Sequence, residues 1–346
     1  MNSKISVIIP FYYQSSKIIS AEHYFSLLAF EKCLSSIFKS KFKNYEVIAV
    51  SDGSSNESIK IAKKYPCKLI KLTKNSGSGF SRNKGAKIAK GNILVFLDSD
   101  VEIHPNTLQI ICEKFYKKKS CDAIQGVFSN KIKYQSYSTE YLQNFHCYYL
   151  FSATKNISHT ESLCTSIFSI KKKLFNELKG FDTNFINANV EDAEFGYRLI
   201  KKGLKISLEK KIEIIHHTNF GIWNFIKRIL RIHTGEMKMY LRYKKISMKT
   251  KQTNYQSVFF GIGLIFIMMV LLVGNFFYKI PNLANILILL NIIFILLHLK
   301  FLKFIYVSKG FFSTLRGIFF SYLHKFLFII CIVFGSVDFY IFGNKY

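Results

Sequence analysis

Residues 92–100 read NILVFLDSD, a short apolar run that closes with two aspartates one residue apart. The uncharged run Ile93–Leu97 predicts a buried β-strand. Similar runs precede it at Ile5–Ile9, Glu46–Val50 and Lys68–Leu72, with helical patterns between them near 22–38, 55–65 and 79–89. This alternation predicts an α/β fold with a mostly parallel, Rossmann-like sheet flanked by helices.

Polar residues follow the predicted strands, where ligands of parallel sheets bind. Asp98 and Asp100 would repel each other unless a cation or a hydrogen-bond donor lies between them, and Mg²⁺ or Mn²⁺ bridging a diphosphate would supply that cation. As an isolated motif, the pair is also compatible with a solvated turn. Asp52 could accept hydrogen bonds from a nucleobase or ribose, and Gly53 would permit close approach.

Three further segments suggest chemistry, each beside a plainer structural interpretation. The segment 75–86, with Gly77 near its start, enters a helix and directs Arg82 toward an anionic phosphate, or it is a loop with a helix cap. Glu191 and Asp192 open a helix, where two acids either suit the helix dipole or include a general base. His216 ends a short strand and is either a packed core residue or a third metal ligand.

The region between 121 and 219 mixes strands and helices. Strands are predicted at Asp122–Phe128, Ser166–Ile170, Ile206–Leu208 and Ile212–His216, and helices at 138–152 and Glu191–Gly203. Residues 222–251 follow with nine Lys and Arg residues and one acid at helical spacing, which is typical of a helix in a membrane interface.

The C-terminal part holds three apolar stretches, Ser257–Tyr278, Ile280–Leu299 and Phe326–Gly343. A bilayer crossing needs roughly 20 such residues. The domains expected are therefore 1–219 (catalytic), 220–256 (basic membrane-interface segment) and 257–346 (two or three transmembrane helices). The distribution of Lys and Arg predicts a multi-pass membrane protein whose first domain is cytoplasmic and whose C-terminus is external, unless the third stretch lies in the interface.

Composition narrows the partners and the compartment. The 346 residues carry a formal net charge of +28, but no nucleic-acid-binding motif accompanies it, so an anionic membrane surface is the better partner. The seven cysteines form no CxxC pair, which favours reduced thiols over a disulfide framework or a zinc site.

Taken in order, the motifs resemble family 2 glycosyltransferases with the GT-A fold. The matching elements are Val7-Ile8-Ile9-Pro10, Asp52-Gly53-Ser54, Arg82-Asn83-Lys84-Gly85-Ala86, Asp98-Ser99-Asp100, Gly180-Phe181-Asp182, Glu191-Asp192 and His216. The resemblance covers roughly residues 4–219. It implies a metal-dependent inverting hexosyltransferase that uses a nucleotide-diphosphate sugar, with a UDP-sugar as the working expectation.

The resemblance also implies a role for each site residue. Pro10, Tyr12 and Asp52 would line the nucleotide pocket, with Gly53, Gly77 and Arg82 on the donor. Asp98, Asp100 and His216 would hold Mg²⁺ or Mn²⁺, with Asp98 also near the ribose. Asp192 would be the general base, with Glu191 beside it. The sequence departs from the family pattern at Ser51, at Tyr13 and at the single Gly180. The first two departures leave open which nucleobase the donor carries.

The acceptor expected is membrane-associated and polyprenyl-linked, within cell-surface glycan synthesis. No Gln-x-x-Arg-Trp motif follows Asp192, which favours addition of a single sugar. Two alternatives stay open: an enzyme that charges polyprenyl phosphate directly, and a non-catalytic membrane scaffold that keeps the fold.

Overall fold

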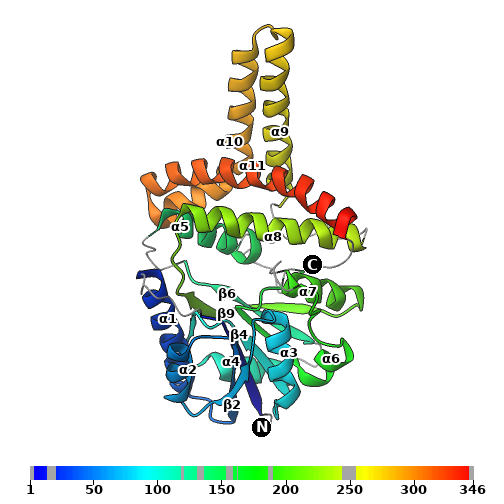
Figure 1. Ribbon diagram of the computed structural model, residues 1–346. Coiled ribbons are helices and arrows are strands. Elements are labelled where there is room, and N and C mark those ends of the chain that lie inside the picture. Colours follow the sequence, from blue (N-terminus) through cyan, green and yellow to red (C-terminus); the bar gives the residue numbers. More distant parts are fainter. Residues whose placement is uncertain are drawn as a thin grey trace. The chain divides into compact units, whose positions relative to one another are not determined.

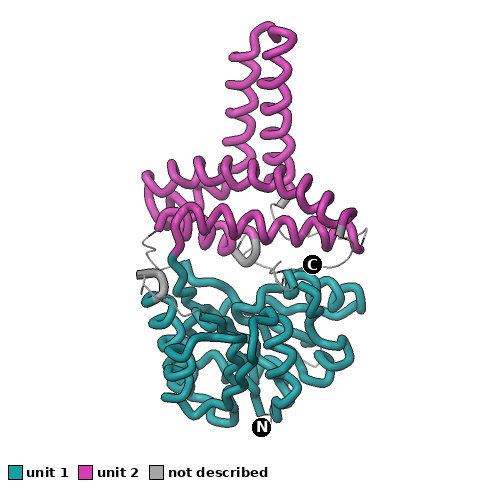
Figure 2. The backbone as a smooth tube through the Cα atoms, viewed as in Figure 1, with its two compact units in different colours: residues 1–132, 155–219, 345–346 teal, residues 133–154, 220–344 magenta. Residues whose placement is uncertain are grey.

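The computed structural model describes residues 4–13, 21–117, 121–130, 136–152, 159–161, 163–185, 190–243 and 255–342. The chain forms two compact units (Figure 2). The first comprises residues 1–132, 155–219 and 345–346, and the second comprises 133–154 and 220–344. The catalytic and membrane roles expected for the two ends of the chain stay predictions.

Unit 1 is a sheet with helices on its faces (Figure 1). Its described strands are β1 (Ile5–Phe11), β2 (Tyr45–Asp52), β3 (Lys68–Leu72), β4 (Ile93–Leu97), β5 (Val101–Ile103), β6 (Ala123–Phe128), β7 (His159–Thr160), β8 (Ile167–Lys171) and β9 (Ile206–His216). Its described helices are α1 (Ala21–Phe38), α2 (Asn56–Lys63), α3 (Ser78–Ile88), α4 (Thr107–Lys117), α6 (Lys172–Glu177) and α7 (Glu191–Lys201).

The strands are ordered β3-β2-β1-β4-β8-β6-β9-β5, with β7 beside β9. Strands β3, β2, β1 and β4 are mutually parallel, as the sequence predicts, whereas β8 runs antiparallel to both β4 and β6. The two strands predicted at 206–208 and 212–216 are one strand, β9. The interruption between them is a β-bulge in β9. Gln125 of β6 pairs with Leu208, but Val127, two residues later, pairs with Glu213, five residues further along β9.

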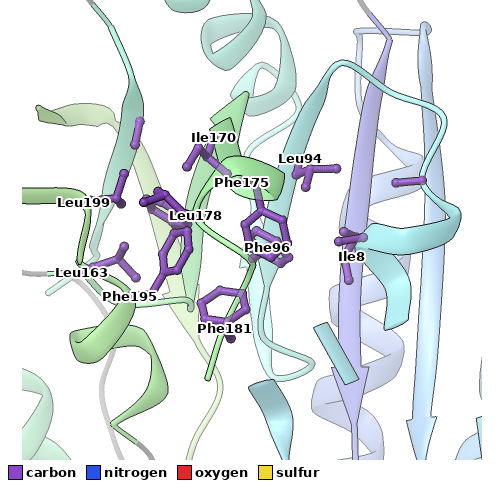
Figure 3. Close-up of a cluster of buried hydrophobic side chains, with 14 of the residues drawn as sticks. Ile8, Leu94, Phe96, Leu163, Ile170, Phe175, Leu178, Phe181, Phe195 and Leu199 are labelled. Atoms are coloured by element: carbon purple, nitrogen blue, oxygen red, sulfur yellow. The ribbon is translucent and has the colours of Figure 1, made fainter. Parts of the chain in front are cut away.

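An aromatic core fixes β4 against α7 (Figure 3). The rings of Phe96 in β4 and Phe181 pack edge to face with centroids 5.1 Å apart, and the ring centroid of Phe181 lies 4.9 Å from that of Phe195 in α7. The amide of Asn83 in α3 donates to the Phe181 carbonyl and accepts from the Phe181 N–H. The same buried cluster therefore positions the side chains that follow β4 and those that begin α7.

Unit 2 is helical. It consists of α5 (Tyr137–Phe145), which continues as a π-helical turn (His146–Ser152), α8 (Ile222–Tyr243), α9 (Tyr255–Tyr278), α10 (Leu283–Lys309) and α11 (Phe311–Phe342). Helices α9, α10 and α11 are each long and apolar enough to cross a bilayer. Helix α8 covers residues 222–243 of the predicted basic segment. Residues 244–254 of that segment lie outside the described part of the chain. Figure 1 shows α9 and α10 as a hairpin and α11 beside α8.

Candidate active site

Strand register brings together residues that are distant in sequence. Leu97 of β4 pairs with Ile167 of β8, so the next residue on one strand, Asp98, meets the preceding residue on the other, Ser166. The Ser166 hydroxyl donates to Asp98 Oδ2 at 2.7 Å. In the same way Val101 of β5 pairs with His216 of β9, which brings His216 Nε2 to 3.1 Å from Asp100 Oδ2.

The centre of the site is the buried guanidinium of Arg82. It donates from Nη1 to Glu191 Oε1 and from Nη2 to Asp98 Oδ1, each at 2.7 Å. Arg82 is 4% exposed, yet its pKa is raised, because the attraction of Asp98, Glu191 and Asp192 outweighs the opposing effect of burial. Both are charge-assisted hydrogen bonds, one to each of two carboxylates, and bonds of this kind are stronger than those between neutral groups. Arg82 therefore links the end of β4 to the start of α7.

Glu191 and Asp192 have different surroundings, although they are adjacent. Glu191 also accepts a short hydrogen bond from the Ser78 hydroxyl, and its Oε2 has no hydrogen-bond partner among the described residues. Asp192 accepts from the backbone N–H groups of Ala193 at 2.7 Å and Thr165 at 3.3 Å. Burial, and then the charge of Glu191, raise the pKa of Asp192 to about 7 against the lowering effect of Arg82. A carboxyl with this pKa can take a proton near neutral pH.

At the end of β2, the backbone of the loop before α3 lies close to Asp52 and Gly53. Both carboxylate oxygens of Asp52 accept backbone N–H groups, from Ser76 at 2.8 Å and from Gly77 at 2.9 Å. Gly53 has φ +74°, and a Cβ there would lie 2.8 Å from the Asn75 nitrogen. In the structure Asp52 and Gly53 organise the loop that starts α3. Their contact with a nucleotide, and that of Gly77, stay predictions.

Pro10 and Tyr12 also lie at this edge of the sheet. Pro10 is buried in β1 opposite Val50, and the Tyr12 side chain, just beyond the strand, is exposed. Their place is compatible with the predicted nucleotide pocket, and their role stays a prediction.

The structure brings two of the three predicted metal ligands into direct contact. Asp100 and His216 form a pair, whereas Asp98 is held by Arg82 and Ser166. Among the described residues, no three His, Cys, Asp or Glu side chains form a metal cluster. Mg²⁺ is usually held by one or two carboxylates together with substrate phosphates, so Asp100 fits a cation that binds with its substrate. Metal binding stays a prediction.

Sequence reasoning missed several neighbours of these acids. Ser166 reaches Asp98 because β8 is antiparallel to β4. The N–H of Thr165, just before β8, donates to Asp192 in the first turn of α7. The Tyr13 hydroxyl lies 2.8 Å from Ser99 Oγ, and burial raises the pKa of Tyr13. No local motif predicts these contacts, since each joins residues that are distant in sequence.

Comparison with known proteins identifies related chains. A model described as glycosyl transferase family 2 matches residues 6–179, and one described as glycosyl transferase family group 2 matches residues 93–335. An uncharacterized glycosyltransferase, YibD, of Escherichia coli is 31% identical over 117 residues, which is 32% of this chain and 30% of that protein. A poly(ribitol-phosphate) beta-glucosyltransferase of Bacillus spizizenii is 37% identical over 131 residues, or 36% of this chain and 19% of that protein.

These matches cover only part of each relative. The chain spans less than half the length of the curated relatives that it matches first. Among solved structures, a mannosyltransferase from Pyrobaculum calidifontis in complex with GDP-Man and Mn²⁺ superimposes with a TM-score of 0.58 and 13% identity, over 98% of this chain and 88% of that one. At this identity, the likeness concerns the fold alone.

Proposed function

Because the chain belongs to glycosyltransferase family 2 and has the GT-A fold, we propose that it transfers one sugar, with inversion, from a nucleotide-diphosphate sugar to a membrane-associated, lipid-linked acceptor. The observation that carries this proposal is the convergence of Asp98, Glu191 and the neighbouring Asp192 on the buried Arg82. An acid with a pKa of about 7 thus lies beside a fixed cation, at the strand end where ligands of such sheets bind.

In the proposed reaction, Asp192 removes the proton of the acceptor hydroxyl as its oxygen attacks the anomeric carbon. The attack comes from the face opposite the leaving nucleotide diphosphate, so the configuration inverts. Backbone N–H groups of Ala193 and Thr165 hold the Asp192 carboxylate in place. Arg82, which Glu191 and Asp98 hold beside the site, would offset negative charge that develops on the leaving group.

A divalent cation fits the same scheme. Asp100, beside His216, offers a carboxylate of the kind that Mg²⁺ and Mn²⁺ accept, and the donor diphosphate would complete the coordination. When bound, the metal would supply charge neutralisation on that diphosphate. The solved mannosyltransferase with the same fold contains Mn²⁺, which supports a divalent cofactor.

The purified full-length protein should transfer a sugar from one member of a nucleotide-sugar panel to a lipid in a membrane extract. Mass analysis of the product tests the proposal: an extended lipid-linked glycan supports it, and a sugar monophosphate lipid supports the alternative in which polyprenyl phosphate is the acceptor. Excess chelator should abolish transfer, and added Mn²⁺ or Mg²⁺ should restore it. Absence of transfer and of donor hydrolysis across the panel would favour the scaffold alternative.

We also propose that α9 and α10 cross the membrane, whereas α11 lies at its surface. Helix α8 carries five Lys and Arg residues over 22 positions, which would be costly in the hydrocarbon region. Its large apolar face and basic character suit the headgroup level. Because α11 lies alongside α8, the place of α8 in the membrane also decides that of α11.

The contacts between α8 and α11 extend along both helices in the same direction. The rings of Phe225 and Phe320 lie 5.3 Å apart, His233 Nε2 lies 2.8 Å from His324 Nε2, and further along Lys238 pairs with Asp338. A helix that crossed the bilayer could not stay beside a surface helix over this length. Only the α9–α10 hairpin is then left to span. This proposal takes the alternative that the sequence left open, in which the third stretch lies in the interface, over three spans with an external C-terminus.

Reporter fusions in a bacterial host check this arrangement. A fluorescent protein fused after α11 should fluoresce, and alkaline phosphatase at the same place should be inactive, because both would face the cytoplasm. Phosphatase inserted in the turn at Lys279–Asn282 should be active and serves as the matched control. Active phosphatase after α11 would instead establish a third crossing.

A further inference from the structure

A cavity of about 530 Å³ opens within unit 2, between α5, α8 and α11. Its lining residues are Ser136, Tyr137, Ser138, Ile222, Leu315, Arg316, Phe319 and Phe320. Most of this wall is apolar or aromatic. The volume falls within the usual range of sites for small ligands, about 300–1,000 Å³. The cavity therefore has room for the end of an amphiphilic molecule.

Arg316 supplies the positive charge in this wall. Its guanidinium carbon lies 3.5 Å from the ring centre of Tyr137, so it stacks on an aromatic face. Among the described residues it has no acidic partner. Stacking uses the face of the guanidinium and leaves its N–H edge for an anion. Ser136 and Ser138 each donate to the Phe220 carbonyl at 2.6 Å, so Arg316 is the group suited to bind a charged ligand.

The surroundings of Arg316 favour a lipid over a soluble anion. Ile222, Leu315 and Phe319 line the cavity and are also exposed at the surface, as are Trp223 and Phe312 nearby in sequence. Exposed aromatic and aliphatic residues beside an arginine are typical of the headgroup level of a membrane. The net charge of +28 likewise favours anionic partners.

We propose that this cavity binds the phosphate end of an isoprenoid-type phosphate lipid. Arg316 would pair with the phosphate, and Leu315, Phe319 and Ile222 would contact the first part of its single hydrocarbon chain. The inference rests on the proposed function, because this lipid is the acceptor class proposed there. Both acceptor alternatives carry such a phosphate or diphosphate.

Binding to the full-length protein in detergent tests the inference without donor or transfer. Farnesyl phosphate serves as the probe, and farnesol, inorganic phosphate and dioctanoyl phosphatidate serve as comparison ligands. We expect farnesyl phosphate to bind at least tenfold more tightly than the other three. Arg316→Gln should weaken its binding about ten- to a hundredfold, as expected for loss of a charge-assisted hydrogen bond, and Arg316→Lys should restore part of it.

The matched control is Arg231→Gln, which removes the same charge from an exposed site on α8 outside the cavity. It should leave binding within twofold. Equal effects of the two variants, or equal binding of farnesol, would overturn the inference, as would phosphatidate binding as tightly as farnesyl phosphate. Retained phosphate-lipid binding by a protein without transferase activity would uphold the cavity and count against the proposed function alone.

Discussion

Asp192→Asn is expected to lower the rate of sugar transfer by about 10²–10⁴-fold, the usual contribution of a general base. The amide cannot accept the proton of the acceptor hydroxyl, but it occupies nearly the same space as the carboxyl. Donor binding should therefore persist. The measurement is kcat/KM for transfer, with donor affinity determined separately. Unchanged turnover would remove Asp192 as the base.

The pH profile gives this prediction a second measurement. Because the pKa of Asp192 is raised to about 7, the base is largely protonated below that pH, and activity should rise as the pH passes through 7 and then level. The raised pKa also means that native protein loses stability, relative to unfolded chain, as pH rises from about 4 toward 7. Asp192→Asn should therefore be at least as stable at pH 8. Glu177→Gln, an exposed acid on α6, is the control.

The second large effect is expected from Arg82→Met. The variant leaves Glu191, which is buried, and Asp98 without their shared cation. Removal of one partner from a buried ion pair costs about 3–5 kcal/mol. This loss should lower the melting temperature of unit 1 by roughly 6–20 °C. Transfer should be abolished.

Thiol-reactive fluorescence can follow this unfolding, because Cys33, Cys112 and Cys121 are free and buried in unit 1. Lys87→Met changes an exposed residue of the same helix and should shift stability by no more than about 0.5 kcal/mol. Adding Glu191→Gln to Arg82→Met should recover part of the stability, since one uncompensated charge disappears. If the single variant melted like Lys87→Met, Arg82 would not hold the acids together.

Much of the fold follows from local pattern. The predicted bounds of β3 and β4 match the structure. The helix near 22–38 differs from α1 by one residue at its start, and the helix near 79–89 differs from α3 by one residue at each end. The two strands have short runs of mainly apolar residues, and the two helices have apolar residues at clear helical spacing. The polar interruption at Glu209–Lys211 predicted a break in β9, because a bulge and a loop look alike in sequence.

The acidic residues of the site could be predicted from the sequence, but most of their hydrogen-bond partners could not. Asp98, Asp100, Glu191 and Asp192 stand at element ends, where position alone suggests chemistry. Arg82 was expected to face phosphate, and in the structure it bridges two acids. Antiparallel pairing of β8 with β4 has no local signature, since it arises from the packing of the whole sheet.

Because Arg82 is hydrogen-bonded to both Glu191 and Asp98, ligand binding near it would be coupled to the proton affinity of Asp192. A phosphate that draws the guanidinium toward itself competes with Glu191 and Asp98 for the same N–H groups. Since Arg82 lowers the proton affinity of Asp192, any such displacement raises that affinity. In the proposed mechanism, occupancy by an anionic ligand and the proton affinity of Asp192 would thus be linked, and that affinity would be highest once the ligand is in place.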